Sequence, residues 1–163
     1  MIDAPAVLER RLEGLLASHP TLKLATVGHG DMPWITAAFF TEDGPYQLLL
    51  MLDAGGRTLA NLQANPDVAV MIESGDPTTL FAQAEARAEI MDERCGATFR
   101  DALIAKTPAC ATVVALPRLV PVRVHVDRWR ITDARSGGVP ARDLVRRRPS
   151  ARTADAMLEH LGR

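Results

Sequence analysis

Residues 79–91 constrain the fold of this chain more than any other segment. Mostly apolar side chains alternate there with mostly polar or charged ones: Leu80, Ala82, Ala84, Ala86, Ala88 and Ile90 against Phe81, Gln83, Glu85, Arg87, Glu89 and Met91. The Ala, Glu, Gln and Arg content favours a helix by intrinsic propensity. A period of two held over about a dozen residues is instead typical of a strand with one buried face. We therefore predict a strand whose alanines lie on a crowded face.

The remaining segments read as further strands and short helices separated by turns. We expect helices over residues 6–18, Arg57–Ala64 and 92–105, and strands over residues 22–27, 33–40, 46–52, 68–72 and 119–126. Residues 128–132 either continue the last strand or pair with it. The third strand is almost wholly apolar, which predicts burial on both faces. Six strands without a repeated βαβ rhythm predict a mainly β (α+β) fold, a closed or nearly closed antiparallel barrel.

Composition narrows the possible functions. The chain has 163 residues, 47% of them hydrophobic, and a formal net charge of -1. It fits one domain and offers no overall field that would attract nucleic acid or a membrane surface. Cys95 and Cys110 form no metal or redox motif, and the four histidines are scattered, so we expect reduced thiols and no metal site. No signal-peptide pattern and no apolar run of about 20 residues is present, which predicts a cytoplasmic protein without a membrane span.

The turn from Gly55 to Thr58 is the strongest candidate for ligand chemistry. It leads from a buried strand into a helix, where unpaired backbone N–H groups favour an anion such as phosphate. Arg57 adds a forked donor and Thr58 a hydroxyl. Glycines and an arginine before a helix also serve turn geometry and solubility alone. No catalytic residue is identified, because no nucleophile motif is present, so the chemistry of an enzyme here would belong to a bound cofactor.

The order of segments resembles the pyridoxamine 5′-phosphate oxidase-like family of FMN-binding split barrels. Residues 24–27 and 31–40 resemble the opening hairpin of that family. Residues 57–70 resemble its most recognisable motif, in which a basic residue precedes a short helix that ends in Asn-Pro and runs into a strand. Residues 86–90 are similar to its next strand. The resemblance covers roughly residues 15–133 and implies a six-stranded antiparallel split β-barrel with short flanking helices.

The chain is expected to divide where the resemblance ends and the sequence from Gly137 onward becomes looser. Residues 1–136 would form the FMN-binding split-barrel domain, with residues 1–20 as its N-terminal helix and lead-in. Residues 137–163 would form a C-terminal tail, partly disordered, with a short helix over residues 153–161. The basic run from Arg146 to Arg148 in this tail is read as a solvated segment rather than an anion contact.

The same resemblance implies a homodimer with the flavin between subunits, and it assigns the contacts. The second strand would lie along the flavin with Thr36, Ala37, Ala38 and Thr41, the third strand would add Met51 and Leu52, and Arg57 and Thr58 would hold the phosphate. The fifth strand would contribute at Phe81, with Gln83 one step along on the same face. Trp34, Phe39, Phe40 and Met51 would shape the pocket or pack in the core.

Departures from the family pattern limit the function that the resemblance implies. The usual Ser-Arg-Lys is Gly56-Arg57-Thr58 here, so one of two cations is missing unless Arg118, Arg123 or Arg128 of a partner subunit compensates. The C-terminal substrate pattern of the vitamin oxidases is not recognisable. We therefore expect a flavin-dependent oxidoreductase that transfers hydride to an unidentified small molecule and is not a true pyridoxamine phosphate oxidase. The alternatives are a deazaflavin or haem protein, with His29 or His125 as axial ligand, and a non-catalytic dimeric flavin-binding or stress module.

Overall fold

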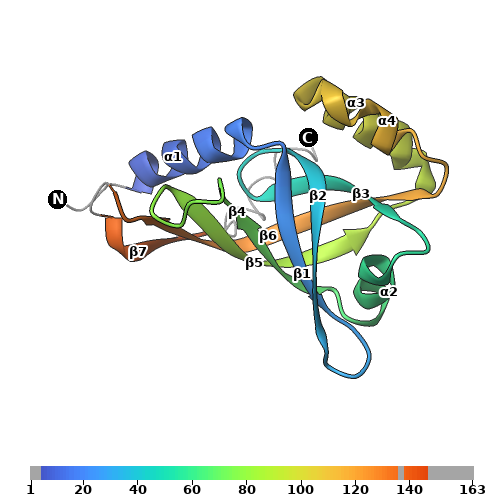
Figure 1. Cartoon of the computed structure of the whole chain (residues 1–163), viewed down its shortest axis with the longest axis horizontal. Coiled ribbons are helices and arrows are strands. Elements are labelled where there is room, and N and C mark those ends of the chain that lie inside the picture. The colour runs from blue at the N-terminus through green and yellow to red at the C-terminus, as the bar shows by residue number, and fades with distance from the viewer. Residues whose placement is uncertain (1–4, 136–137, 147–163) are drawn as a thin grey trace, which may run out of the picture.

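The strands of the protein close into an antiparallel barrel. The computed structural model describes residues 5–135 and 138–146. Its strands are β1 (Thr21–Val27), β2 (Pro33–Glu42), β3 (Gln47–Asp53), β4 (Asp67–Ile72), β5 (Phe81–Ile90), β6 (Leu119–Asp133) and β7 (Gly138–Val145). They are hydrogen-bonded in the order β3-β2-β1-β4-β5-β6-β7, and a further β3–β6 pairing closes the first six into a ring. The predicted six-stranded antiparallel barrel is therefore confirmed, with β7 added outside it (Figure 1).

Short helices flank the barrel. They are α1 (Pro5–Ser18), α2 (Arg57–Ala64), α3 (Gly96–Lys106) and α4 (Ala111–Val114), with 3-10 turns η1 (Glu93–Cys95) and η2 (Pro108–Cys110). The helix over Arg57–Ala64 has the predicted bounds. Asp92 does cap the next helical segment, because its side chain accepts from the Arg94 N–H, but that segment begins as η1 and only then becomes α3. No helix in the described part of the chain is long and apolar enough to cross a membrane.

Strand β6 settles the alternative left open for residues 119–132, because it is a single strand. Its first half pairs with β3 and its second half with β7. The register against β5 shifts once, since Glu85 lies opposite Arg128 and Ala86 opposite Val126, leaving Asp127 as the extra residue of a bulge. One strand thus belongs to the barrel and also carries the added edge.

The alternation of β5 is confirmed. Ala82, Ala84, Ala86 and Ala88 are buried, while the side chains between them are exposed. The small side chain of Ala84 lies opposite Trp129 of β6, which is fully buried and donates its indole N–H to the Pro45 carbonyl at 2.7 Å. Pairing to β4 on one side and β6 on the other overrides the helical propensity of the segment.

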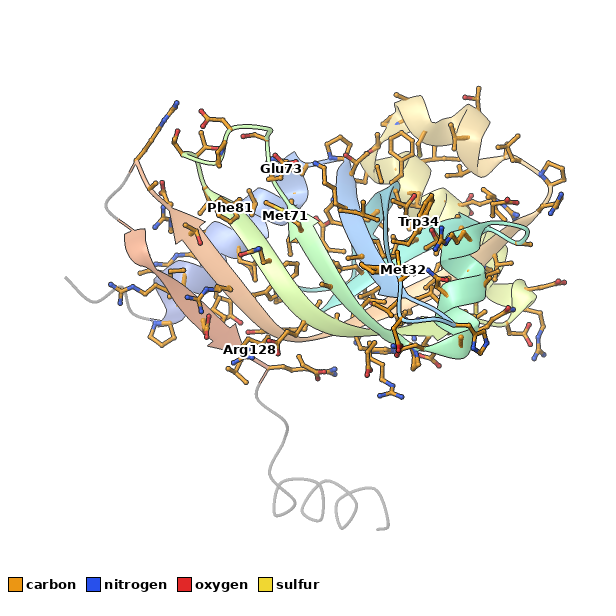
Figure 2. All side chains as sticks on the ribbon, turned by 60° about the horizontal axis from the view of Figure 1, so that its bottom comes forward. Met32, Trp34, Met71, Glu73, Phe81 and Arg128 are labelled. Atoms are coloured by element: carbon orange, nitrogen blue, oxygen red, sulfur yellow. The ribbon has the colours of Figure 1, made fainter. Side chains whose placement is uncertain are left out.

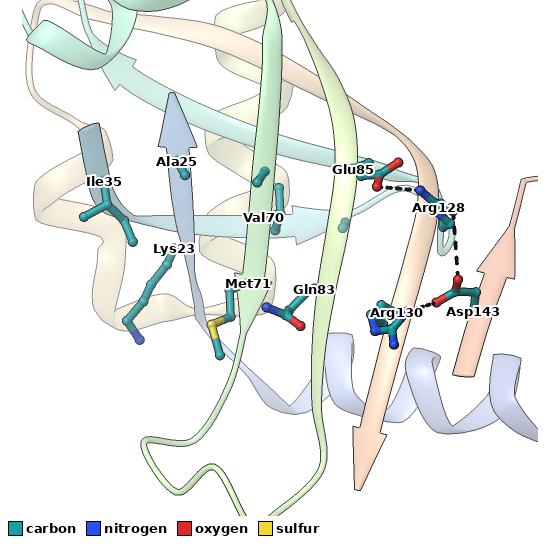
Figure 3. A pocket seen from close by; sticks show the side chains of 12 residues that line it. Lys23, Ala25, Ile35, Val70, Met71, Gln83, Glu85, Arg128, Arg130 and Asp143 are labelled. Carbon is teal, nitrogen blue, oxygen red and sulfur yellow. Dashed lines mark hydrogen bonds and ion pairs between the residues drawn. The ribbon is translucent and has the colours of Figure 1, made fainter. Parts of the chain in front are cut away.

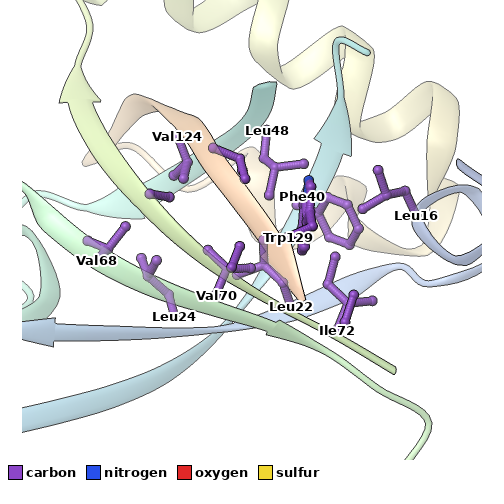
Figure 4. Close-up of a cluster of buried hydrophobic side chains, with 14 of the residues drawn as sticks. Leu16, Leu22, Leu24, Phe40, Leu48, Val68, Val70, Ile72, Val124 and Trp129 are labelled. Carbon is purple, nitrogen blue, oxygen red and sulfur yellow. The ribbon is translucent and has the colours of Figure 1, made fainter. Parts of the chain in front are cut away.

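The core fills the barrel and continues beneath α1 (Figure 4). Inward side chains include Leu22, Leu24, Phe40, Leu48, Leu50, Val70, Ile72, Val124 and Trp129. Helix α1 adds its apolar stripe of Leu8, Leu12, Leu15 and Leu16, as its spacing predicts. A second cluster on the outer face of β3 joins Leu49 and Met51 to Phe99 and Leu103 of α3. Strand β3 is therefore buried on both faces, as predicted.

Strand β7 differs from the expected tail. Residues 138–145 pair with the second half of β6, where the sequence predicts a looser tail. The strand contains Pro140, which an outer edge strand tolerates because one of its sides needs no partner. The helix expected over residues 153–161 and the residues after Arg146 in the basic run lie outside the described residues.

Candidate functional site

A pocket of about 530 Å³ opens where the start of α2 faces strand β2 and helices α3 and α4. We call it the α2 pocket. Its polar end is formed by Asp53, Gly56, Arg57 and Thr58. Its strand wall comes from Trp34, Thr36, Ala37, Ala38, Phe39, Met51 and Leu52. Its apolar wall comes from Leu103, Val113, Val114, Leu116 and Leu119. Thr21 completes the lining.

The polar end is built by the turn that starts α2. Gly56 is the N-cap residue, and no side chain caps the first N–H groups of the helix. The turn is tight at Gly56, because a Cβ there would lie 3.2 Å from the Asp53 carbonyl oxygen, whereas Gly55 faces the movable guanidinium end of Arg118. Uncapped N–H groups carry positive partial charge, so this end of the pocket suits an anion.

Two side chains of α2 reinforce that preference. Thr58 is only 8% exposed, and its hydroxyl has no hydrogen-bond partner among the described residues. Arg57 is exposed and places its guanidinium carbon 4.6 Å from the centroid of the Trp34 ring. The carboxylate of Asp53 lies on the same rim and offsets part of the positive charge. The pocket therefore offers a cation, a free hydroxyl and backbone donors at one end.

The strand wall of the α2 pocket contains an open edge. Strand β2 pairs with β1 over residues 33–39 but with β3 only from Phe40 to Glu42. Over residues 33–39 the other edge of β2 has no strand partner within the described chain. Thr36, Ala37 and Ala38 lie in the middle of this stretch. Because backbone N–H and C=O groups need partners, this edge can hydrogen-bond a polar ligand.

Seven of the nine predicted cofactor residues line the α2 pocket: Thr36, Ala37, Ala38, Met51, Leu52, Arg57 and Thr58. The structure does not bring Thr41 there, because it pairs with Leu49 further along β2 and is buried. Trp34 and Phe39 line the pocket, whereas Phe40 is in the core. The α4 wall was not predicted, since the segment from Pro108 to Arg118 shows no regular period.

Gln83 lies in a second pocket, of about 480 Å³, on the outer face of β1, β4, β5 and β6 (Figure 3). We call it the outer-face pocket. Arg128 binds Glu85 at 2.5 Å and lies 3.9 Å from Asp143, which also pairs with Arg130 at 3.3 Å. The hydrogen bond that Arg128 donates to Glu85 raises the pKa of Arg128. Lys23 on the same face is paired with Glu73. The cations of the outer-face pocket are thus already paired with carboxylates.

The two pockets share the strand β2 as their border. Ile35 lines the outer-face pocket, while its neighbour Trp34 lines the α2 pocket. Met32, Trp34 and Ile35 are 62%, 39% and 62% exposed. Figure 2 shows Met32 and Trp34 toward the α2 side of this face and Arg128 on its far side. Large exposed apolar side chains thus lie between the α2 pocket, which holds seven of the predicted cofactor residues, and the outer-face pocket, which holds Gln83.

The remaining candidates lie elsewhere. His125 contacts Glu89 at 2.7 Å, and neither it nor His29 lines either of these pockets. Arg118 rests against Gly55, whereas Arg123 lies 5.9 Å from the Phe99 ring. Burial raises the pKa of the Cys110 thiol, which keeps it protonated. Within residues 5–135 and 138–146 no group of three His, Cys, Asp or Glu side chains could hold a metal ion.

Comparison with known proteins agrees with this architecture. Residues 8–133 match the family model described as pyridoxamine 5′-phosphate oxidase. No curated protein matches the chain significantly in sequence.

Three solved structures illustrate the likeness. ChuZ of Campylobacter jejuni is 15% identical with a TM-score of 0.72, over 86% of this chain and 60% of that one. A heme binding protein from Mycobacterium smegmatis is 18% identical with a TM-score of 0.70, over 89% of this chain and 59% of that one. A Clostridium acetobutylicum protein, described as related to general stress protein 26 and of the pyridoxinephosphate oxidase family, is 15% identical with a TM-score of 0.66, over 84% and 95%. The chain spans about three fifths of the first two proteins. At these identities the likeness shows the fold.

Proposed function

The chain belongs to the pyridoxamine 5′-phosphate oxidase family, and from that premise we propose that it binds FMN in the α2 pocket as a flavin-dependent oxidoreductase. One observation carries the proposal. The start of α2 places Arg57, the unpartnered hydroxyl of Thr58 and uncapped N–H groups at one end of a pocket whose other walls are mainly apolar. An anionic group and an adjoining flat ring system suit those two ends.

The residues present fit the parts of FMN. Arg57, Thr58 and the N–H groups of α2 would bind the phosphate. The open edge of β2 at Thr36, Ala37 and Ala38 would orient the polar rim of the ring. Leu103, Leu116 and Leu119 would exclude water from its apolar part. When bound, the flavin supplies the hydride chemistry, and the chain supplies binding, orientation and a dry wall.

We propose further that the protein is a homodimer with the cofactor at the subunit interface. Met32, Trp34 and Ile35 form an exposed apolar strip beside the α2 pocket, and such strips mark contact surfaces. A second copy covering this strip would bring the outer-face pocket and Gln83 of one protomer toward the α2 pocket of its partner. The two separated halves of the predicted site would then form one site.

The cofactor is tested by colour and by phosphate dependence. The purified protein should be yellow, release FMN on denaturation and bind added FMN more tightly than riboflavin. Arg57→Ala should weaken FMN binding roughly tenfold or more, because a hydrogen bond to a charged group contributes about 1.5–3 kcal/mol. Arg10→Ala, which removes an exposed arginine on α1, is the matched control and should leave the affinity unchanged. A colourless protein that takes up no flavin would refute the proposal.

The dimer is tested at Ile35, whose exposure makes substitution harmless to the core. Ile35→Glu should convert the dimer to a monomer in size-exclusion chromatography with light scattering and should weaken FMN binding. Ile90→Glu changes another exposed isoleucine, 39% exposed at the end of β5, and serves as the control. A monomeric wild type would contradict this part of the proposal.

Haem is the second candidate, and it rests on the structural likeness to a protein described as heme binding. The α2 pocket suits it less well, because no histidine among the described residues lines that pocket. A Soret band in the purified protein would favour haem over flavin. A protein that binds FMN but turns over no electron acceptor would instead be a non-catalytic flavin-binding module. A protein that binds a deazaflavin and not FMN would be a deazaflavin protein of the same fold.

A further inference from the structure

We propose that Trp34 is a positioning residue that holds Arg57 ready for the phosphate of the ligand. This inference rests on the proposed FMN site and adds a residue that acts through Arg57 rather than on the phosphate itself. Trp34 lies on β2 opposite Thr26, and Arg57 is the first residue of α2. Both line the α2 pocket, and 4.6 Å separates the guanidinium carbon from the centroid of the indole ring.

Within residues 5–135 and 138–146, Arg57 has no other partner that would fix it. No ion pair or hydrogen bond joins its side chain to another described residue. A free arginine on an exposed helix start samples many rotamers, and ordering it upon binding weakens the affinity. Attraction between the cation and the exposed indole favours some of these rotamers before any ligand binds. The indole therefore lowers the ordering cost that the ligand would otherwise have to bear.

The contact with Trp34 leaves Arg57 able to bind an anion. Arg57 lies over the indole with its guanidinium carbon 4.6 Å from the ring centroid, and the guanidinium carries five N–H donors. Trp34 can thus restrain Arg57 without neutralising its charge. An acidic partner would do the opposite, because it would take those same donors, as Glu85 does with Arg128 in the outer-face pocket.

A double-mutant cycle tests the coupling. Trp34→Leu removes the aromatic face and Trp34→Phe keeps one, each in the wild-type and Arg57→Ala backgrounds. FMN and riboflavin affinities are measured by flavin fluorescence. We expect Trp34→Leu to weaken FMN binding about threefold to tenfold, from the loss of the stack and of the ordering it provides. Trp34→Phe should recover most of that loss. In the Arg57→Ala background Trp34→Leu should have no further effect, and riboflavin affinity should not change in any variant.

Opposite outcomes overturn the inference while leaving the proposed function intact. Equal losses of FMN and riboflavin affinity in Trp34→Leu would mean that the indole contacts the ring system directly. Additive losses in the double variant would mean that Trp34 does not act through Arg57. Size-exclusion chromatography of each variant checks that the assembly is unchanged, and a monomeric Trp34→Leu variant that loses both ligands would equally count against a positioning role.

The stack itself can be measured without any flavin. The chain has two tryptophans, and Trp129 is fully buried with a hydrogen-bonded indole. Arg57→Ala should therefore change the tryptophan emission of the ligand-free protein, and the same substitution in the Trp34→Phe background should not. An unchanged spectrum in both backgrounds would refute the stack. Failure of the wild type to bind FMN, with this spectral change present, would refute the cofactor and not the stack.

Discussion

Strand β2 carries two cation–aromatic pairs with opposite surroundings. Near its C-terminal end, Lys106 of α3 lies 3.6 Å from the centroid of Phe40. Near its N-terminal end, Arg57 of α2 lies 4.6 Å from the centroid of Trp34. The contact is of the same kind at both ends. The two pairs differ in how far their side chains are exposed to solvent and in whether the cation also forms an ion pair with a carboxylate.

The lysine pair is enclosed and satisfied. Phe40 is fully buried, and the Lys106 side chain is 10% exposed. The ammonium donates to Glu42 at 2.5 Å and to the Leu16 carbonyl at 2.8 Å, which ties α3 to β2 and to the end of α1. Burial lowers the pKa of Lys106, and Glu42 opposes that shift. Two of the three ammonium donors are satisfied within the fold and the side chain is nearly buried, so the role of this pair is structural.

The arginine pair is open. Trp34 is 39% exposed, and Arg57 has no carboxylate within ion-pairing distance among the described residues. The pair lies on the rim of the α2 pocket beside uncapped N–H groups. The difference supports the proposal that Arg57 binds a ligand, since its cation lacks an anion among the described residues and lies at a cavity.

The largest expected effect separates the two aromatic residues. Phe40→Ala leaves a cavity in the barrel core and should lower the free energy of unfolding by about 3–5 kcal/mol. Trp34→Ala removes a ring that is 39% exposed within one protomer and leaves no cavity in the barrel core, so it should cost clearly less than Phe40→Ala. Urea denaturation of the apoproteins measures both. Similar losses would show that the two ends of β2 do not differ as described.

Removing the buried lysine should have the next largest effect. Lys106→Met leaves Glu42 and the Leu16 carbonyl without their donor, which should cost about 1–3 kcal/mol of stability. Lys23→Met, at a lysine that is 46% exposed and paired with Glu73, is the control and should stay within about 0.5 kcal/mol. FMN affinity should be unchanged in Lys106→Met. A loss of affinity there would contradict a purely structural role for Lys106.

The pH dependence of the stability of the same variant tests whether burial lowers the pKa of Lys106. Because the folded-state pKa of Lys106 lies below its ordinary value of 10.5, the unfolded chain binds more protons between those two values. The difference in free energy of unfolding between the wild type and Lys106→Met should therefore rise with pH across that window, and this added increment is lost as pH falls through the lowered pKa. Urea titrations at several alkaline pH values measure this difference. A flat difference would show that burial does not perturb Lys106.

The smallest effect is expected where binding is proposed. Arg57→Ala should change the free energy of unfolding by no more than about 0.5 kcal/mol, since the side chain is exposed and its single contact is weak. Its effect on FMN affinity should be far larger. A strongly destabilised Arg57→Ala protein would make Arg57 a structural residue like Lys106.

The sequence predicted the repetitive parts of this fold well and the irregular parts poorly. The alternation of β5 and the bounds of α2 follow from local periods and breakers, which need no knowledge of neighbours. The continuity of β6 past the bulge at Asp127, the small helix α4 and the strand β7 depend on partners distant in the chain. No local pattern marks them.

The same division holds at the site. The sequence by itself determined that a buried strand turns through Gly55 and Gly56 into a helix carrying Arg57 and Thr58, because turn chemistry and helix starts are local. Tertiary contacts instead bring Trp34 against Arg57, add the α4 wall to the pocket, and leave Thr41 and Gln83 outside it. Barrel closure fixes which faces of distant strands meet, and that register is a property of the whole sheet rather than of any one segment.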